Sequence, residues 1–403
     1  MKIKFTEIDL KKPLQPIYVD TRYSRLFVLV CWGYLPIGMF QLACQPNLRT
    51  FSVEQLQNEI LKFVGWQLWE QAVAGTLNDL KGGTAQSFPP ISVVVCTRDR
   101  ALSLERCLQA LADLDYPNYE VVVVDNCSQD KEVREVVNRR GFHYVREDKS
   151  GLNWARNRGI KEVKFNIIAY IDDDALAARG WLRGIAKGFE DPDVMVVTGM
   201  VLSSEFEALA QIAFESYGGM SKGFIGHKIK RDELSKRDLF WASNWGVGAN
   251  MAFRRTLFEA IGNFDVALDV GTPTNGGGDV EFFYRAVAVG YTLCYEPIAM
   301  VQHVHRRDNA ALMRQVYNNG RSFATYLLTI VRNEPYRCFE ILWFALRWWI
   351  WDWQLRRLFI GIIKRDRETL RLALTELKGC SSAPWAYWKS RKIALLLMKD
   401  NHL

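Results

Sequence analysis

The sequence lacks the cysteine spacing of a zinc site, because none of its eight cysteines forms a CxxC pair. Several of them lie inside apolar runs, where a free thiol packs as a small hydrophobic group. The charged start, MKIKFTEIDLKK, is not followed by the apolar stretch of a secretory signal. We therefore expect reduced thiols and a cytoplasmic protein. The C-terminal tail described below adds the inner face of the plasma membrane as an expected location.

Long, unbroken apolar runs are missing as well. The run over residues 26–40 is interrupted by two glycines and a proline, and it is shorter than the roughly 20 residues that a membrane-spanning helix needs. It predicts two short strands, residues 26–30 and 37–42, joined by a turn, and a helix follows over residues 53–73. With 49% hydrophobic and 24% charged residues, the chain is not a disordered one.

An excess of positive charge is absent from most of the chain. The net charge is +7, and residues 331–403 hold 14 lysines and arginines against 7 aspartates and glutamates, which leaves 38 of each kind elsewhere. The same tail holds seven of the fourteen tryptophans. A basic stripe along a folded domain, which nucleic-acid binding uses, is not indicated, so we expect no nucleic-acid partner.

From Ile91 the sequence alternates between apolar strands and amphipathic helices. The strands ISVVVC, YEVVVV, FHYVRE and NIIAYI are separated by helical segments. The first of these helices gathers four apolar residues on one face, namely Leu104, Cys107, Leu108 and Leu111. Continuous Val and Ile strands in this order are typical of a Rossmann-like α/β fold, a mainly parallel sheet with helices on both faces.

Composition and pattern divide the chain into three parts. Residues 1–85 predict a small α+β unit, and the segment KGGT at its end has the composition of a linker. The α/β domain is expected over residues 91–320, and residues 321–403 predict a helical tail rich in tryptophan and arginine.

Three adjacent carboxylates, Asp172, Asp173 and Asp174, follow the strand NIIAYI. Such groups repel one another unless a cation lies between them. In an extended segment Asp172 and Asp174 point to one side and Asp173 to the other, so the first and third suit one hard divalent cation, Mg²⁺ or Mn²⁺. A solvated turn or a helix N-cap is the alternative.

Two more candidate residues lie near the ends of neighbouring strands, where open α/β sheets bind their ligands. Asp125 follows VVVV and could accept hydrogen bonds from a nucleotide base or ribose, or form an Asx-turn. The stretch GLNWARNRGI places Arg156 early in a helix, where a cation and the helix N-terminus suit a phosphate. A solvated arginine on an exposed face is the alternative for this segment.

Seven motifs follow one another between residue 91 and about residue 320: VVVCTRDR, VVVVDNCSQD, GLNWARNRGI, IDDDALAARGWL, GVGANMAFRR, GNFDVALDVGTPTNGGGDVEFFYRAVAVGY and YEPIAMVQHVHRR. As an ordered set they resemble the family 2 glycosyltransferases of GT-A fold. The resemblance implies that Thr97 and Arg98 frame the nucleoside and that Asp125, Asp173 and Arg156 belong to the nucleotide site. It also implies that Asp172 and Asp174 form the metal-binding DxD of the family.

The later motifs imply the remaining site residues. Asp279 in GGGDVEF matches the general base, although Gly278 stands where the family often has glutamate, and Glu281 is the alternative base. His303 and His305 match the HxH region, which supplies a further metal or diphosphate contact. Asn250, with Gly278 and Glu281, is a candidate for contacts with the donor sugar or the acceptor.

The resemblance implies the transfer of one sugar from a nucleoside-diphosphate sugar, with a UDP-sugar expected first, to a saccharide or lipid-linked acceptor in polysaccharide or glycolipid assembly. One carboxylate base without a carboxylate nucleophile predicts a single displacement with inversion. The QxxRW motif of processive synthases is missing. The alternatives are an inactive nucleotide-sugar-binding scaffold and a nucleotidyltransferase, although CTRDRALS lacks the glycines of a nucleotidyltransferase phosphate loop.

The tail contains a strongly apolar segment, CFEILWFALRWWIWDWQLRRLFIGII, at residues 338–363. Its five charged residues argue against spanning a bilayer, where each costs roughly 2.5–3.5 kcal/mol at the centre. Tryptophans beside arginines are typical of a helix that lies in the interface of an anionic membrane. Packing on the catalytic domain or in a dimer contact is the alternative.

Overall fold

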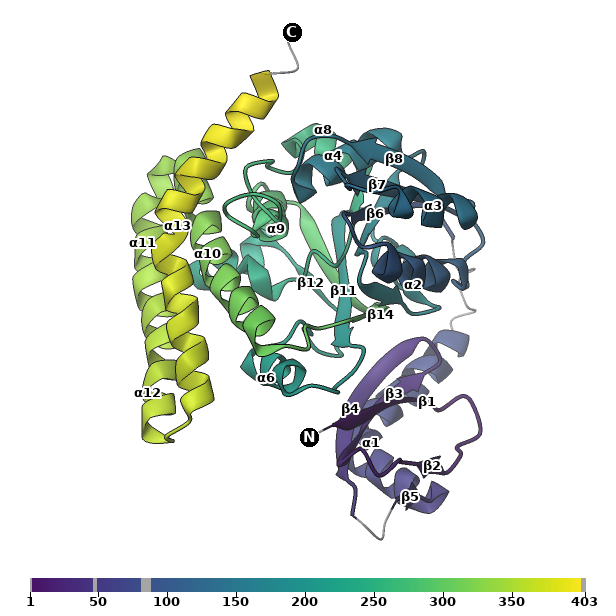
Figure 1. Ribbon diagram of the computed structural model, residues 1–403. Coiled ribbons are helices and arrows are strands. Elements are labelled where there is room, and N and C mark those ends of the chain that lie inside the picture. Colours follow the sequence, from purple (N-terminus) through teal and green to yellow (C-terminus); the bar gives the residue numbers. More distant parts are fainter. Residues whose placement is uncertain (1, 46–48, 81–87, 400–403) are drawn as a thin grey trace.

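The computed structural model describes residues 2–45, 49–80 and 88–399. Figure 1 shows a small N-terminal unit, a central sheet with helices on both faces, and a layer of long helices at the C-terminal end. Each of the eight cysteines is free, as the spacing predicted. Among the described residues, no helix combines the length and the apolar character needed to cross a membrane.

The N-terminal unit has its own apolar core between a sheet and a helix. Its strands are β1 (Ile3–Asp9), β2 (Ile17–Tyr18), β3 (Arg25–Trp32), β4 (Leu35–Ala43) and β5 (Thr50–Phe51), and its helix is α1 (Val53–Leu80). The predicted strand pair is confirmed by β3 and β4, which turn at Gly33 with a φ of 64°. The helix is seven residues longer than the predicted 53–73, and the expected linker KGGT lies outside the described residues.

The central sheet is mixed. Its strands are β6 (Ile91–Thr97), β7 (Tyr119–Asn126), β8 (His143–Glu147), β9 (Ile167–Asp172), β10 (Ala175–Ala177), β11 (Val194–Ser203), β12 (His227–Ile229), β13 (Asn250–Arg254) and β14 (Thr292–His303). The order is β10-β14-β11-β13-β9-β6-β7-β8, with β12 beside β14. The predicted parallel arrangement holds from β9 to β8, whereas β13 runs antiparallel to both of its neighbours.

Helices cover both faces of this sheet. One face carries α2 (Ala101–Ala112), α3 (Glu132–Arg139) and α5 (Trp181–Gly188), and the other carries α4 (Leu152–Glu162), α8 (Arg255–Ile261) and α9 (Gly278–Ala288). Side chains alternate along β6, with Val93 and Val95 facing α2 and Val94 facing α4. The apolar stripe predicted for the first helix is fully buried on α2.

Long helices follow the sheet. They are α10 (Asn309–Asn333), α11 (Cys338–Phe344), the π-helical segment η4 (Ala345–Leu355), α12 (Arg356–Ile363) and α13 (Arg367–Lys399), and the shorter α6 (Leu209–Tyr217) and α7 (Lys236–Phe240) lie earlier in the chain. The predicted helical tail is present, and its first helix already begins at Asn309. Figure 1 shows α13 beside α11 and α12, with α10 between them and the sheet domain.

Candidate active site

The carboxyl ends of three parallel strands bring the predicted polar residues to one edge of the sheet. β6 pairs with β7 so that Thr97 lies opposite Asp125, and it pairs with β9 so that Cys96 lies opposite Asp172. The chain passes from β6 outward through β7 and β8 and then returns to place β9 on the other side of β6. Such a reversal of strand order opens a crevice at the carboxyl edge, where α/β proteins bind ligands.

Asp172, Asp174 and His303 form one cluster at this edge. β9 ends at Asp172, and a tight turn leads to β10, whose Ala175 pairs with His303 at the end of β14. One potential ligand atom from each of the three side chains lies within 4.8 Å of the others. His303 Nε2 is 3.0 Å from Asp174 Oδ1, whereas no described residue donates a hydrogen bond to the Asp172 carboxylate.

Burial and neighbouring charges shift the pKa values in this cluster. Burial and the charge of Asp174 raise the pKa of Asp172 to about 6. Burial acts in the same direction on Asp174, but the hydrogen bond with His303 and nearby cations outweigh it and lower the pKa of Asp174. Burial lowers the pKa of His303, and the contact with Asp174 reverses this and raises it. Asp174 therefore stays ionised beside His303, whereas Asp172 would ionise more readily beside a further cation.

Asp173 points away from this cluster, as the alternation of the three aspartates predicts. Its Oδ2 accepts a hydrogen bond from Thr97 Oγ1 at 2.7 Å, and its Oδ1 accepts one from Arg100 at 2.9 Å. Arg100 also contacts Asp174 Oδ2 at 3.1 Å. Arg100 is a site residue that the sequence reasoning missed, although it stands in the TRDR segment that was singled out.

His305 is not part of the cluster of potential metal ligands. Its Nε2 is 2.7 Å from Glu215 Oε1 on α6, and its ring packs edge-on against Phe214. Only 3% of the residue is exposed. β14 ends at His303, so His305 lies beyond the strand, but the two rings stay side by side with their centroids 5.3 Å apart, and both residues line the same cleft.

Asp125 lies at the neighbouring strand end, where its carboxylate is engaged by the protein. Its Oδ2 accepts a hydrogen bond from the Tyr144 hydroxyl at 2.7 Å, and its Oδ1 accepts one from the Ser128 N–H at 3.0 Å. Arg98 reaches across to Ser150 Oγ at 2.7 Å. Asp125 therefore shapes the loop after β7, which is the Asx-turn alternative, and it is almost wholly buried.

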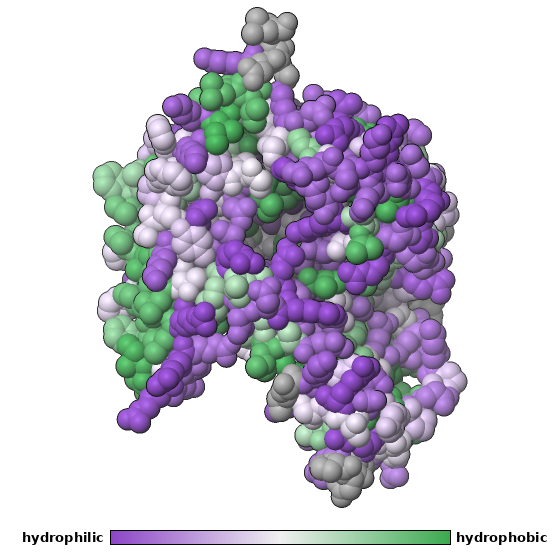
Figure 2. Space-filling view, viewed as in Figure 1, coloured by the Kyte–Doolittle hydropathy of each residue, from purple (hydrophilic) through white to green (hydrophobic). Residues whose placement is uncertain are grey.

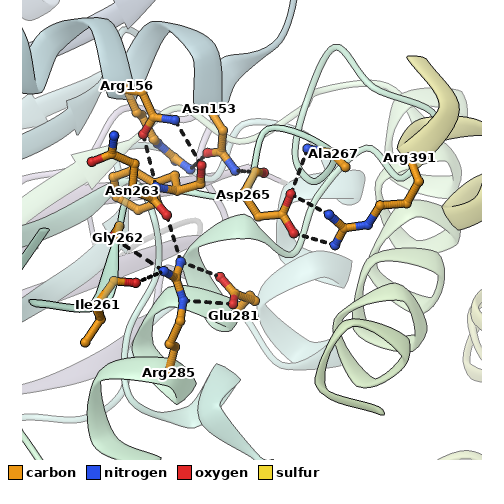
Figure 3. Close-up of polar contacts among 12 residues, drawn as sticks. Asn153, Arg156, Ile261, Gly262, Asn263, Asp265, Ala267, Glu281, Arg285 and Arg391 are labelled. Atoms are coloured by element: carbon orange, nitrogen blue, oxygen red, sulfur yellow. Dashed lines mark hydrogen bonds and ion pairs between the residues drawn. The ribbon is translucent and has the colours of Figure 1, made fainter. Parts of the chain in front are cut away.

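Arg156 is not placed in a phosphate site, nor is it solvated. It is 3% exposed, and its guanidinium donates hydrogen bonds to Asp269 Oδ2 at 2.5 Å and to Asn153 Oδ1 at 3.0 Å. Figure 3 shows Arg156 and Asn153 together inside the domain. The reason is the close packing of α4 on the sheet: a Cβ on Gly159 would lie 2.6 Å from Val94. This turns the buried face of α4, Arg156 included, toward the interior.

Asp279 stands in the first turn of α9. Its Oδ2 accepts a hydrogen bond from the Gly248 N–H at 2.7 Å, and a Cβ on Gly248 would lie 2.8 Å from that oxygen and 2.9 Å from Arg156 Nη2. Only glycine therefore lets this backbone reach the carboxylate while Arg156 stays close. Burial and the charge of Asp269 raise the pKa of Asp279, against the charge of Arg156. A partly buried carboxylate with a raised pKa suits a general base.

Glu281, the alternative base, is committed to a structural ion pair. Both of its carboxylate oxygens bind the guanidinium of Arg285 at 3.0 Å, and Arg285 also donates to backbone carbonyls of residues 261–263 (Figure 3). A Cβ on Gly278 would lie 2.3 Å from Asn153 Nδ2 and 2.7 Å from Asp269 Oδ2. Asp269 therefore holds a carboxylate beside the position where the family often has glutamate.

Asn250 is also not brought to the cleft. It is 1% exposed; its Oδ1 accepts a hydrogen bond from Trp181 Nε1 at 2.9 Å, and its Nδ2 donates to the carbonyl oxygens of Met200 and Ala299. These contacts join β11 and β14 where their pairing register shifts, between Gly199 and Val201. The motif GVGANMAFRR carried no sign that distinguishes such a structural asparagine from a ligand contact.

A cleft of about 850 Å³ lies over this edge of the sheet. Thr97, Arg98 and the three aspartates line one side, and the opposite wall comes from α10, namely Ala311, Arg314, Gln315, Asn318 and Asn319. Figure 2 shows a hollow between the C-terminal helices and the sheet domain. The loop of residues 270–275 also lines the cleft and leads into α9, but Asp279 itself is not among the lining side chains.

The α10 wall was not predicted from sequence. Its polar residues recur at the spacing of one helix face, a pattern that an exposed surface shares. The signal that could have indicated it is the combination of a polar stripe with buried apolar residues such as Leu312 and Val316 on the other side of the same helix.

Comparisons with known proteins agree with this arrangement. Residues 92–262 match the family model described as Glycosyl transferase family 2. Glycosyltransferase AglE of Haloferax volcanii is 27% identical over 241 residues, which cover 57% of this chain and 71% of that protein. GalNAc(5)-diNAcBac-PP-undecaprenol beta-1,3-glucosyltransferase of Campylobacter jejuni is 25% identical over 179 residues, which cover 43% of this chain and 54% of that protein.

A solved structure shares the fold. The mannosyltransferase of Pyrobaculum calidifontis, in complex with GDP-Man and Mn²⁺, superimposes with a TM-score of 0.51 at 16% sequence identity. The superposition covers 74% of this chain and 88% of that one.

Proposed function

The chain is a family 2 glycosyltransferase with the GT-A fold, and on this premise we propose that it transfers one sugar from a nucleoside-diphosphate sugar to an acceptor hydroxyl, with a divalent metal and with inversion. The observation that carries this proposal is the cluster of Asp172, Asp174 and His303 at the floor of the cleft, where strand order reverses.

The cluster has the donor set of a divalent-metal site. Carboxylate oxygens are the ligands that Mg²⁺ and Mn²⁺ prefer, and a neutral imidazole is a common further ligand. The carboxylate of Asp172 receives no hydrogen bond from the described residues, and His303 Nδ1 is buried without a partner. Asp172, Asp174 and His303 would hold the metal, which supplies positive charge for the departing diphosphate.

The donor nucleotide is assigned to the strand ends on the same side of the cleft. Thr97 and Arg98 line the cleft beside Asp173, and Asp125 shapes the neighbouring loop. Arg100 and Arg306 also line the cleft and contact Asp174, at 3.1 Å and 3.9 Å, so both stand where they can neutralise phosphate oxygens. A UDP-sugar is the donor we propose first.

Asp279 is the proposed base. It takes the proton of the acceptor hydroxyl as that oxygen bonds to the anomeric carbon, while the bond from the same carbon to the diphosphate oxygen breaks and the nucleoside diphosphate departs from the opposite face. One such displacement inverts the anomeric configuration. Glu281 is unsuited to this role because Arg285 occupies both of its oxygens.

The acceptor is proposed to enter along α10, whose polar face forms the wall opposite the donor residues. Saccharide hydroxyls suit the amides of Gln315, Asn318 and Asn319, and an anionic group suits Arg314. The name of the similar Campylobacter jejuni enzyme contains an undecaprenol-linked glycan, GalNAc(5)-diNAcBac-PP-undecaprenol. We accordingly propose a saccharide or lipid-linked acceptor, in polysaccharide or glycolipid assembly, and action at the inner face of the plasma membrane.

Calorimetry with UDP, GDP, dTDP and CMP, each with and without Mn²⁺, tests the donor site. We expect one diphosphate to bind tightly only with Mn²⁺, and Asp174→Asn to lose that metal-dependent binding. Removing one metal ligand should weaken binding by about tenfold or more. Equal binding of the diphosphate with and without Mn²⁺, or native affinity in Asp174→Asn, would show that this cluster does not hold a metal for the donor.

A further inference from the structure

The helix formed by α11, η4 and α12 carries large apolar side chains both on its buried face and at exposed positions, and packing explains only the buried ones. Ile341, Phe344 and Trp349 are buried, and Phe344 and Trp349 pack against Phe323 of α10. This inner face anchors the helix on the folded domain, which is the packing alternative expected for the tail. An apolar outer face is not needed for that contact, since a surface helix of a globular protein is normally polar there.

Ten large apolar side chains of this helix and of the turn before it are exposed, and they are here called the aromatic ridge: Tyr336, Phe339, Leu342, Trp343, Leu346, Trp351, Phe359, Ile360, Ile362 and Ile363. Phe339 is 85% exposed and Trp343 is 65% exposed. Figure 2 shows apolar residues along the edge of the molecule formed by α11 and α12. Contiguous apolar surface of this kind marks an interaction site.

A slot beside the ridge combines apolar walls with cations. It has a volume of about 290 Å³ and is lined by Phe240, Phe339, Trp343, Phe344 and Trp348, by Lys236 and Arg237 of α7, and by Glu340. Lys236 is paired with Glu340 at 2.5 Å, which leaves the guanidinium of Arg237 as the cation of the slot without a carboxylate partner among the described residues. The guanidinium of Arg237 lies over the Trp348 ring, 4.8 Å from its centroid. Both cations are exposed. A lipid with an anionic head group and an acyl chain would match both the cationic and the apolar side chains of this slot.

The charge of the surrounding helices selects the partner. Within residues 331–399 the exposed cations are Arg332, Arg356, Lys364, Arg365, Arg367, Arg371, Lys378, Lys389, Lys392 and Lys399, and the exposed carboxylates are those of Asp366 and Glu368. Arg332 precedes the ridge and Lys364 follows it directly. A second copy of this chain would bring the same positive charge to the contact and be repelled, whereas an anionic bilayer attracts it.

We propose that the aromatic ridge and the slot beside it bind the surface of an anionic membrane, with the tryptophans at the level of the head groups and Arg237 on a lipid phosphate. This proposal rests on the proposed function, because the membrane would hold the lipid-linked acceptor. Helix α10 lines the cleft at Arg314 and Asn318, and it leads through residues 335–337 into α11, where the ridge begins. Because α10 lies between the outer helices and the sheet domain, binding at the ridge holds α10, whose other side forms the cleft wall, close to the membrane.

Flotation with phosphatidylcholine vesicles containing about 30% phosphatidylglycerol tests this surface in the absence of donor and acceptor. The native chain should float with them and bind pure phosphatidylcholine vesicles more weakly, because anionic lipid supplies the attraction for the cations. Phe339→Gln/Trp343→Gln should lower the partition coefficient by about tenfold or more, since two apolar anchors are lost. Arg237→Gln, which leaves the Lys236–Glu340 pair intact, should lower binding by roughly fivefold on anionic vesicles only.

Leu61→Gln/Trp66→Gln on α1 is the matched control. Leu61 and Trp66 are 62% and 66% exposed, comparable with Trp343, but they lie in the N-terminal unit. This variant should bind as the native chain does. Equal binding of the Phe339/Trp343 variant and the native chain, no flotation of the native chain, or a native dimer that this variant dissociates would each overturn the proposal. Nucleoside-diphosphate binding is measured separately, so such a failure leaves the proposed activity standing.

Discussion

At the scale of single residues, the proposed reaction depends most on Asp279. Asp279→Asn keeps the shape of the side chain, so metal-dependent binding of the nucleotide should persist while transfer falls by roughly 10²–10⁴-fold, the contribution of a general base. Single-turnover transfer and nucleotide calorimetry on the same protein separate the two effects. Because burial and Asp269 raise the pKa of Asp279 above its ordinary 3.8, the rate should fall on the acid side at a pH above that value. Native transfer rates in Asp279→Asn would contradict this assignment.

Residue patterns revealed the carboxylates of the site better than its arginines. Three aspartates after a buried strand can be placed from the alternation of an extended chain and from their repulsion alone. Arg156 could not, because its partner Asp269 lies 113 positions further along the chain, and only the fold shows that they meet. Nor could Asp279 be placed relative to Gly248, since no local pattern marks a backbone N–H as the partner of a carboxylate.

At the scale of secondary-structure elements, the two longest C-terminal helices meet through glycine. A Cβ on Gly379 of α13 would lie 1.9 Å from the carbonyl oxygen of Tyr317 on α10. Gly379→Ala should therefore lower the free energy of unfolding by about 1–3 kcal/mol, as overpacking does. Gly65→Ala on α1 is the matched control, because nothing lies within 4 Å of its Cβ, and there alanine should raise stability by up to about 1 kcal/mol.

Thermal unfolding of Gly379→Ala and Gly65→Ala tests these two predicted changes in stability. A Gly379→Ala protein as stable as the native chain would mean that α10 and α13 can separate without cost. Displacement of α13 also moves the α10 wall of the cleft, so we expect the KM for the acceptor to rise in Gly379→Ala while donor binding changes little.

Elements were predictable where burial leaves a clear pattern in the sequence, either one apolar stripe on a helix or a continuous apolar run in a strand that is buried on both faces. The period of the α2 stripe and the Val-rich strands followed directly from burial against the sheet. The direction of β13 did not, because a buried antiparallel strand carries the same apolar run as a parallel one. The π-helical turn of η4 was also not predictable: it shifts the register between the inner face and the aromatic ridge without any proline or glycine inside the segment.

At the scale of the whole molecule, buried polar contacts fasten the C-terminal helices to the catalytic domain. Arg391 of α13 binds Asp265 (Figure 3), and Glu376 of the same helix accepts a hydrogen bond from Tyr217 on α6. These contacts hold the cleft wall and the aromatic ridge in one fixed relation to the sheet. Weakening one of these contacts should therefore change the free energy of unfolding of the whole chain.

Glu376 gives this coupling a measurable pH dependence. Burial raises the pKa of Glu376 above its ordinary 4.5, although Tyr217 and Arg357 act in the opposite direction. A folded-state pKa above the unfolded one contributes stability that is fully present below the unfolded value and is lost as the pH rises through the folded one.

Glu376→Gln does not titrate, so its urea midpoint should rise relative to the native chain between about pH 4 and about pH 8. Glu368→Gln, at an exposed position of α13, is the control for removing a carboxylate. If the difference between Glu376→Gln and the native chain were the same at both pH values, folding would leave the pKa of Glu376 unchanged, and its burial between α6 and α13 would not disfavour its charged form.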